Sequence, residues 1–236
     1  MLHIIVPCYN PDPGWEKTLV DKFVELQNAL PGTAIELSIV NDGSIKGVDA
    51  ASFNFIKTSI PAVRWISYPE NKGKGYALRY GVKDAEGDYF IYTDIDFPYT
   101  IQSMVDIYFD LVNGADIVAG IRESEYYNKV PKMRVIISKF VKKLIRNLLN
   151  SQITDTQCGL KGFNKRGREI FLETSINRFL FDMQFIMLAS QNKTLIMRPQ
   201  IVYSRPGIIF SHMHYKILFG ESLNFIKLIL FNKNEN

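Results

Sequence analysis

Two aspartates separated by a single residue, Asp94 and Asp96, directly follow the apolar stretch Tyr89–Tyr92. Carboxylates held this close repel each other and raise each other's pKa, so such a pair usually has positive charge between its members. In an extended chain both side chains point to the same side, and their oxygens are ligands that suit Mg²⁺ or Mn²⁺. Such a cation would bind a diphosphate and neutralise charge on a leaving group. The pair therefore predicts metal-assisted transfer from a diphosphate.

A glycine-rich loop with two lysines supplies the next candidates: Lys72, Gly73, Lys74 and Gly75, directly before an expected helix. Glycine lets the backbone approach a ligand closely, and a helix N-terminus attracts anions. The spacing is not that of a Walker phosphate-binding loop. A flexible loop with solvated lysines is an equally good interpretation. Asp42, in the sequence VNDGS, also has a simple alternative, because Asn-Asp-Gly is a common turn.

The elements that must position these residues follow from the hydrophobic pattern, which alternates between strand-like and helix-like segments. Strands are expected over residues 2–6, 35–40, 63–68, 89–93 and 115–120, and helices over 15–29, 49–59, 76–85 and 101–112. This alternation predicts a mostly parallel sheet with helices on both faces. Ligands of such sheets bind at the carboxyl ends of the strands. Five polar loops follow these strands and should share one rim: PCYNP, NDGS, PENKGKG, TDIDF and GIRES.

Length and composition limit the class of protein to which the chain can belong. A chain of 236 residues with 47% hydrophobic and 22% charged residues is typical of one α/β domain. A net charge of +4 is too small to suggest a nucleic-acid partner. Cys8 and Cys158 have no metal-ligand spacing and are expected to be reduced, and His3 is expected in the core. No targeting segment or membrane-spanning stretch is seen, so we expect a cytoplasmic protein.

Seven motifs together resemble family 2 glycosyltransferases, whose fold is a single Rossmann-like GT-A domain. They are VPCYNP, VNDGS, ENKGKGYALRYG, TDIDF, GIRES, DTQCGLKGFNK and RFLFDMQF, in that order. The resemblance covers residues 2 to about 207 and is greatest to polyprenyl-phosphate sugar transferases, especially the dolichyl-phosphate glucosyltransferases. Its most specific part is the stretch Asp155–Phe163.

The resemblance implies a donor side built from the first loops of the rim. A uridine or guanine pocket would contain Pro7, Tyr9, Asn10 and Asp42, and the nucleotide would be bordered by Lys72, Gly73, Lys74 and Gly75. Asp94 resembles a residue that contacts ribose or metal, and Asp96 resembles the principal metal ligand. Mannosyl members carry a glutamine where this chain has Pro98, which leaves the donor sugar and the metal geometry open.

The resemblance also implies an acceptor side. Arg122 would face the donor diphosphate or the acceptor phosphate, and Asp182 would be a carboxylate facing the acceptor. Arg205 resembles a basic residue of a mobile acceptor loop. Three residues would line the sugar and acceptor side, namely Thr156, Gln157 and Cys158, the last of which is expected to be a small buried residue rather than a nucleophile.

These roles predict an inverting glycosyltransferase that uses Mg²⁺ or Mn²⁺. It would move a hexose, with glucose favoured, from a nucleotide sugar such as UDP-glucose to polyprenyl phosphate. One alternative is a GT-A enzyme that acts on a sugar hydroxyl in surface-polysaccharide assembly. Another is a non-catalytic nucleotide-sugar-binding subunit, which the presence of Asp42, Asp94 and Asp96 disfavours.

A basic segment suggests contact with a membrane surface. Residues 129–150 contain seven Lys or Arg and no acidic residue, with apolar residues at helical spacing. Such a helix lies readily on an anionic bilayer, although it could also pack on its own sheet. We expect a GT-A domain over residues 1–210 and an amphipathic C-terminal segment over 211–236 that contacts a membrane or a second copy. The protein would then be peripheral on the cytoplasmic face of a membrane, and a homo-oligomer is possible.

Overall fold

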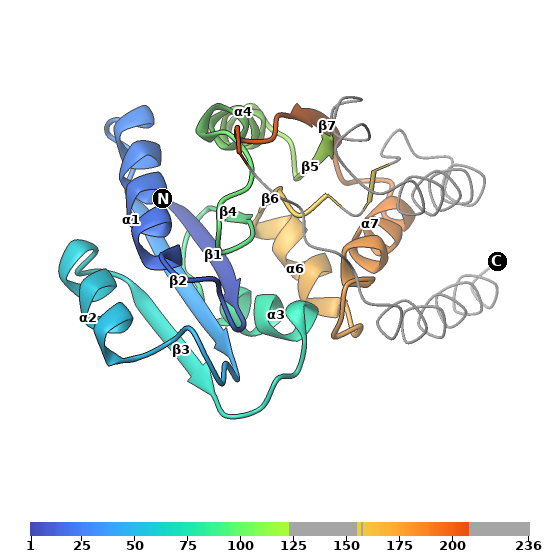
Figure 1. Cartoon of the computed structure of the whole chain (residues 1–236). Coiled ribbons are helices and arrows are strands. Elements are labelled where there is room, and N and C mark those ends of the chain that lie inside the picture. Colours follow the sequence, from blue (N-terminus) through green and yellow to red (C-terminus); the bar gives the residue numbers. More distant parts are fainter. Residues whose placement is uncertain (123–154, 157, 208–236) are drawn as a thin grey trace.

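The computed structural model describes residues 1–122, 155–156 and 158–207 (Figure 1). The expectations for residues 129–150, for 211–236 and for Gln157 lie outside these described residues. The described strands are β1 (Leu2–Cys8), β2 (Ile35–Asp42), β3 (Arg64–Tyr68), β4 (Tyr89–Tyr92), β5 (Ile117–Arg122), β6 (Lys161–Asn164) and β7 (Met197–Val202). The described helices are α1 (Trp15–Ala29), α2 (Ala50–Ser59), α3 (Lys74–Asp84), α4 (Ile101–Val112), α6 (Lys165–Glu173) and α7 (Phe181–Gln191).

All seven strands form one sheet in the order β3-β2-β1-β4-β6-β5-β7. Strand β6 is antiparallel to both of its neighbours, β4 and β5, whereas every other pair is parallel. Six strands therefore run in the same direction, and their carboxyl ends lie at one edge. The expected mostly parallel sheet is confirmed.

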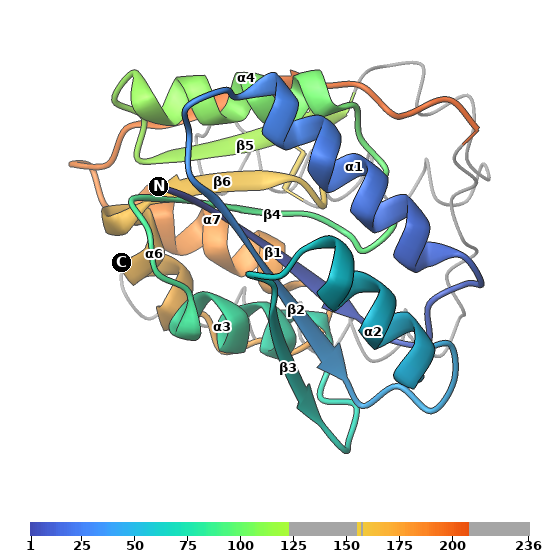
Figure 2. The ribbon, with the colours of Figure 1, turned by 90° about the vertical axis from the view of Figure 1, so that its left-hand side faces the viewer.

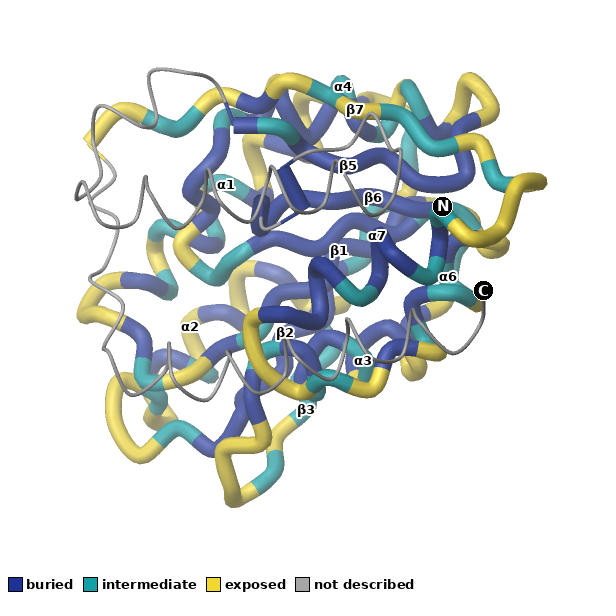
Figure 3. Tube along the Cα trace, turned by 90° about the vertical axis from the view of Figure 1, so that its right-hand side faces the viewer, coloured by how far each residue is buried: buried dark blue, intermediate teal, exposed yellow. Residues whose placement is uncertain are grey.

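Helices cover both faces of this sheet, as the alternating pattern predicts (Figure 2). One core cluster joins the sheet to α1, α2 and α4, and a second joins it to α3, α6 and α7. The second cluster contains closely packed aromatic rings, with Phe163 stacked on Phe171 at 5.1 Å between centroids. Fully burying such a side chain contributes roughly 1.5–3 kcal/mol. Buried residues run along the central strands, while the connecting loops are more exposed (Figure 3).

Several strand and helix ends differ from those expected. Strand β1 continues through Pro7 and Cys8, because these residues still pair with Val40 and Asn41 of β2 after the pairing with β4 has ended at Ile5. Strands β2 and β5 extend to Asp42 and Arg122, and α3 begins two residues early, at Lys74. Asp42, Arg122 and Lys74 therefore lie at the ends of regular elements rather than in the loops between them. His3 is fully buried, as expected.

Candidate active site

The loops that follow β1 and β2 are joined to each other at the rim. Asn10 has a φ of 46°, and its side-chain oxygen accepts hydrogen bonds from the amides of Ile45 at 2.9 Å and Lys46 at 3.2 Å. Its own amide donates to the hydroxyl of Ser44 at 3.0 Å. The Tyr9 side chain beside it is 49% exposed, and Pro7 is partly buried. The first loop therefore presents an accessible ring on a backbone fixed by Asn10.

Asp42 fixes the loop that follows β3. Its residue is only 2% exposed, and its carboxylate accepts hydrogen bonds from the amide of Lys72 at 2.7 Å, the amide of Gly73 at 2.9 Å and the Asn71 side chain at 2.9 Å. A buried carboxylate is stable when its oxygens are satisfied in this way. Asp42 is thus more than a local turn residue, since it connects two loops of the rim.

The glycines of the lysine-containing loop serve a different purpose from the one expected. A Cβ atom would lie 2.4 Å from the Asn177 carbonyl oxygen at Gly73, and 2.4 Å from the Ile176 carbonyl oxygen at Gly75. The amides of Gly75 and Tyr76 donate to the same Asn177 oxygen, at 2.8 and 3.2 Å. The close approach made possible by these glycines is therefore to another segment of the protein. These two amides at the start of α3 are therefore bonded within the protein.

The two candidate metal ligands lie in a turn rather than in an extended strand. The amide of Phe97 donates to the carbonyl of Asp94 at 3.0 Å, and Phe97 has a φ of 46°. The expectation of parallel side chains on an extended chain is therefore wrong. The Asp94 side chain is 39% exposed, and Asp96 is also exposed. Partial desolvation, followed by the neighbouring Asp94 carboxylate, raises the pKa of Asp96.

Lys74 supplies the positive charge beside this pair. Its ammonium lies 2.5 Å from Oδ1 of Asp94. Burial acts to lower the pKa of Lys74, but the carboxylates of Asp94, Asp182 and Asp96 outweigh burial and raise it. A Cβ atom at Gly159 would lie 2.8 Å from Oδ2 of Asp94 and 3.4 Å from the ammonium of Lys74. The donor-side loop, the acidic turn and the segment before β6 therefore meet at one point.

Arg205 holds the acidic turn from the other side. Its guanidinium donates to the carbonyl oxygens of Asp96 at 3.0 Å and Phe97 at 3.3 Å, and its amide donates to the carbonyl of Pro98 at 2.8 Å. The residue expected in an acceptor loop is thus brought to the acidic turn. Its contacts are with backbone oxygens of that turn.

Two buried ion pairs lie among the residues that the sequence places on the expected acceptor side. Arg122 is 8% exposed and Asp155 is 2% exposed. Oδ2 of Asp155 accepts from Nε of Arg122 at 2.8 Å, and Oδ1 accepts from Nη2 at 2.6 Å. Two parallel bonds of this kind fix geometry as well as charge. Asp155 was not among the expected site residues, although it opens the most specific motif of the chain.

The second pair joins Lys161 to Asp182. Lys161 is fully buried, and its ammonium donates to Oδ1 of Asp182 at 2.6 Å, the carbonyl of Thr156 at 3.0 Å and the carbonyl of Cys158 at 2.6 Å. The hydroxyl of Tyr92 donates to the same Asp182 oxygen. Lys161 therefore fastens the acceptor-side segment to the first turn of α7. The sequence signal for this role is a lysine inside the apolar stretch GLKGF.

Thr156 is the one buried hydroxyl of the described acceptor-side segment that lacks a hydrogen-bond partner, and the residue is 1% exposed. Cys158 is fully buried, and burial raises the pKa of its thiol. These properties fit the expected small buried residue better than a reactive thiol. Gln157, between them, is outside the described residues.

The donor set at the acidic turn fits a magnesium-like ion with few protein ligands. Within residues 1–122, 155–156 and 158–207, no group of three or more His, Cys, Asp or Glu side chains is arranged to hold a metal. Mg²⁺ is commonly held by one or two carboxylates together with water and substrate phosphates. Asp94 and Asp96 provide such a pair at an accessible edge.

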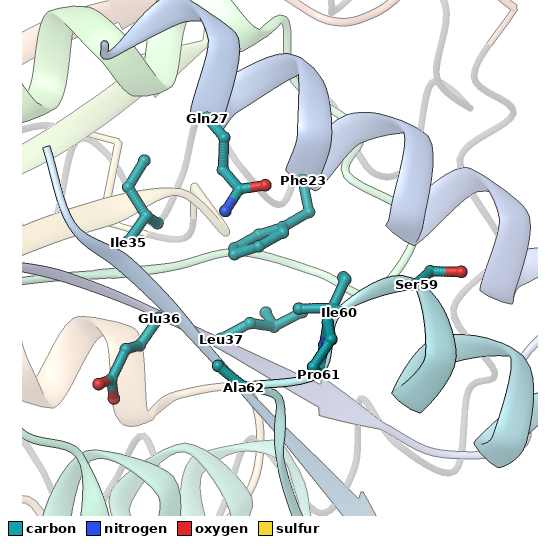
Figure 4. Close-up of a pocket in the computed structure, with 9 residues that line it drawn as sticks. All are labelled: Phe23, Gln27, Ile35, Glu36, Leu37, Ser59, Ile60, Pro61 and Ala62. Carbon is teal, nitrogen blue, oxygen red and sulfur yellow. The ribbon is translucent and has the colours of Figure 1, made fainter. Parts of the chain in front are cut away.

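A pocket elsewhere in the domain is separate from this site. A hollow of about 250 Å³ lies between the end of α1, the start of β2 and the segment after α2. Figure 4 shows Phe23 and Gln27 of α1 beside Ile35 and Leu37 of β2. Because β2 reaches the rim only at Asp42, this pocket lies at the amino ends of the strands.

Among the described residues, no helix is both long and apolar enough to cross a membrane.

The sequence is similar to the sequences of known glycosyltransferases. The family model described as glycosyl transferase family 2 matches residues 3–171. A dolichyl-phosphate beta-glucosyltransferase of Drosophila melanogaster is 28% identical over 206 residues, covering 81% of this chain and 63% of that protein. The chain thus spans less than two thirds of this relative's length.

Two solved structures share the fold. Glucosyl-3-phosphoglycerate synthase from Mycobacterium tuberculosis, in complex with UDP, has a TM-score of 0.66 at 14% identity, covering 98% of this chain and 79% of its own. The mannosyltransferase PcManGT from Pyrobaculum calidifontis, in complex with GDP-Man and Mn²⁺, has a TM-score of 0.56 at 16% identity, covering 85% and 56%. Identities this low indicate similarity of fold alone.

Proposed function

This chain belongs to glycosyl transferase family 2, and we propose that it transfers a hexose, with glucose favoured, from a nucleotide sugar to polyprenyl phosphate. UDP-glucose is the favoured donor. The observation that carries the proposal is the packing of the Lys74–Asp94 pair against Gly159. This contact joins the donor-side loop, the acidic turn and the acceptor-side segment. The similarity to a dolichyl-phosphate beta-glucosyltransferase supports the choice of acceptor.

The donor nucleotide would lie against the first loops of the rim. Tyr9 offers an accessible ring for the base, with Pro7 and Asn10 shaping the loop beside it. Asp42 would act by holding the segment Lys72–Gly75 in position, because its carboxylate is bonded to the backbone there. Asp94 and Asp96 would hold Mg²⁺ or Mn²⁺, which when bound would stabilise negative charge on the departing diphosphate.

The acceptor phosphate would attack in one displacement. One of its oxygens bonds to the anomeric carbon, the bond from that carbon to the diphosphate breaks, and the electron pair leaves with the nucleoside diphosphate. The anomeric centre is inverted. A phosphate monoester has a second pKa of about 6 and needs no base at neutral pH, whereas a sugar hydroxyl needs one. Asp182 is poorly suited to be that base, since Lys161 and Tyr92 already donate to its Oδ1.

Positive charge is needed on the acceptor side to hold the lipid phosphate. Arg205 is the proposed source, with Thr156 and Gln157 lining the acceptor. Arg122, whose guanidinium is paired with the buried Asp155, would act by holding the segment that begins at Asp155 in place. The basic segment 129–150 would keep the protein peripheral on the cytoplasmic face of a membrane, where a lipid acceptor is reached.

A transfer assay tests the proposal. Labelled UDP-glucose is incubated with the full chain and Mn²⁺, with and without polyprenyl phosphate, and glucosylated lipid is expected only when the lipid is present. Asp96→Asn should lower the rate roughly a thousandfold or more, since a neutral amide cannot replace an anionic ligand. Asp21→Asn, at an exposed position of α1, is the matched control. Full activity in EDTA would contradict the metal role, and transfer to an oligosaccharide but not to the lipid would contradict the acceptor.

A further inference from the structure

Lys74 already occupies the carboxylate that the proposed metal would need. Its ammonium lies 2.5 Å from Oδ1 of Asp94, and its side chain is only 17% exposed. The other oxygen, Oδ2, lies where a Cβ atom on Gly159 would come within 2.8 Å of it. One oxygen of Asp94 is thus bonded to an ammonium, and the other faces the backbone of Gly159.

A divalent cation cannot gain the full charge of Asp94 while Lys74 remains bonded to it, because the ammonium and the cation compete for one carboxylate. If Lys74 left alone, Asp94 would lose the ammonium that lies 2.5 Å from its Oδ1. Departure of the ammonium and arrival of a divalent ion therefore compensate each other electrostatically.

We propose that Lys74 is an internal counter-ion, which a divalent cation displaces from Asp94 and which then pairs with the diphosphate of the donor. This inference rests on the proposed function, because it assumes a metal and a nucleotide diphosphate at this edge. The lysine stem has four rotatable bonds and can move its ammonium without moving the helix. The exchange would make metal and donor bind cooperatively, since each favours the same position of Lys74.

Lys72 provides a matched comparison within the same loop. Its ammonium lies over the rings of Tyr68, at 5.5 Å from the centroid, and Tyr76, at 4.9 Å. No carboxylate within the described part of the chain pairs with it as Asp94 pairs with Lys74. Removing either lysine changes the net charge by the same amount, but only Lys74 competes directly for a metal ligand.

Mn²⁺ binding to the full chain tests the exchange without any measurement of turnover. Free Mn²⁺ is followed by electron paramagnetic resonance for the wild type and for Lys74→Gln, Lys74→Arg and Lys72→Gln, with and without UDP. Without UDP, Lys74→Gln should bind Mn²⁺ about tenfold more tightly, the expected gain from removing one charged hydrogen bond that competes for the ligand. Lys74→Arg and Lys72→Gln should stay within about twofold of the wild type.

UDP adds a second readout. In the wild type UDP should tighten Mn²⁺ binding, and in Lys74→Gln this gain should be smaller by about tenfold, because no ammonium is released to the diphosphate. Lys74→Met, which keeps the apolar stem, provides the same test if the glutamine variant does not fold. An unchanged or weaker Mn²⁺ affinity in both neutral variants would overturn the exchange, as would an equal gain in Lys72→Gln.

The outcomes separate this inference from the proposed function. If the wild type transfers glucose and binds Mn²⁺ but the neutral variants at Lys74 bind it no more tightly, only the exchange is overturned. If the wild type binds no Mn²⁺ even with UDP, the metal site and the exchange are both overturned.

Discussion

At the scale of single residues, His3 shows how burial selects a protonation state. Its Nε2 lies 2.8 Å from the hydroxyl of Ser38, and its Nδ1 lies 2.9 Å from the carbonyl of Glu86. An Nδ1–H that donates to the carbonyl leaves Nε2 to accept from the serine, which describes a neutral ring. Desolvation lowers the pKa of His3 below 6.5, although the Glu86 carbonyl and the Glu36 carboxylate partly oppose this shift.

This lowered pKa predicts a loss of stability in mild acid. As the pH falls below 6.5, the unfolded chain takes up a proton that the folded chain does not, so the free energy of unfolding decreases until the folded pKa is reached. Above that window His3 contributes no pH dependence. His3→Gln, which can keep both hydrogen bonds, should have a smaller drop in melting temperature between about pH 7.5 and about pH 5.5 than the wild type. Equal drops in the two proteins would contradict the assignment of a neutral histidine.

The Lys161–Asp182 pair predicts a large stability effect from a single charge. Lys161→Met leaves a buried carboxylate without its cation, and this should lower the free energy of unfolding by about 3–5 kcal/mol in a urea titration. Lys165→Met is the control, because Lys165 and Asp88 are 68% and 55% exposed and such pairs contribute at most about 1 kcal/mol. Lys161→Met combined with Asp182→Leu should recover part of the loss. A similar cost for both single variants would show that burial of the pair is unimportant.

At the scale of elements, the start of α3 depends on a close contact between two loops. Gly73 has a φ of 100° and would place a Cβ atom 2.4 Å from the Asn177 carbonyl oxygen, whereas Gly114 has a φ of 91° with nothing within 4 Å. Gly114→Ala should cost about 1–2 kcal/mol from backbone strain alone. Gly73→Ala should cost at least about 1–3 kcal/mol more, since the clash forces the loops apart. Thermal unfolding of the two variants measures the difference, and equal costs would argue against the loop contact.

The helix and strand ranges show which elements can be predicted from the sequence pattern. The ranges expected for α1 and α4 agree with the structure, since both helices have a regular apolar face and Thr100 caps α4 through the Ser103 amide. No strand or helix was predicted between residues 155 and 207, where β6 lies. That strand has only four residues, including a buried lysine and Gly162, and it pairs with β4 and β5, which are distant in sequence. Its local pattern therefore carries little information.

At the scale of the whole molecule, the topology rule places the candidate loops on one rim. The contacts of Asn10 with the loop after β2, of Asp42 with the loop after β3 and of Asp94 with Lys74 agree with that placement. The rule does not predict which charged side chains form ion pairs with each other. Arg122 pairs with Asp155, and Lys161 pairs with Asp182. These partners meet because β6 lies antiparallel between β4 and β5. Local spacing identifies which residues are chemically capable, whereas the sheet order decides which of them are neutralised.

The whole-molecule proposal of membrane contact depends on the distribution of charge. Residues 129–150 contain seven Lys or Arg and no acidic residue, and each basic residue near an anionic bilayer contributes about 1 kcal/mol. The triple change of Lys139, Lys142 and Lys143 to Glu should therefore strongly reduce sedimentation with anionic liposomes, and binding by the wild type should weaken as salt rises.

A control with the same change in charge tests whether the position of the basic residues matters. Lys17, Lys83 and Lys193 are exposed in the described part of the domain, and their change to Glu alters the net charge by the same amount. If a localised basic segment binds the bilayer, this control should bind anionic liposomes better than the variant in segment 129–150. Donor hydrolysis by both variants should match the wild type, since none of these lysines is placed at the acidic turn. Equal loss of liposome binding in the two variants would show that only net charge matters, and equal binding to neutral and anionic vesicles would contradict the electrostatic explanation.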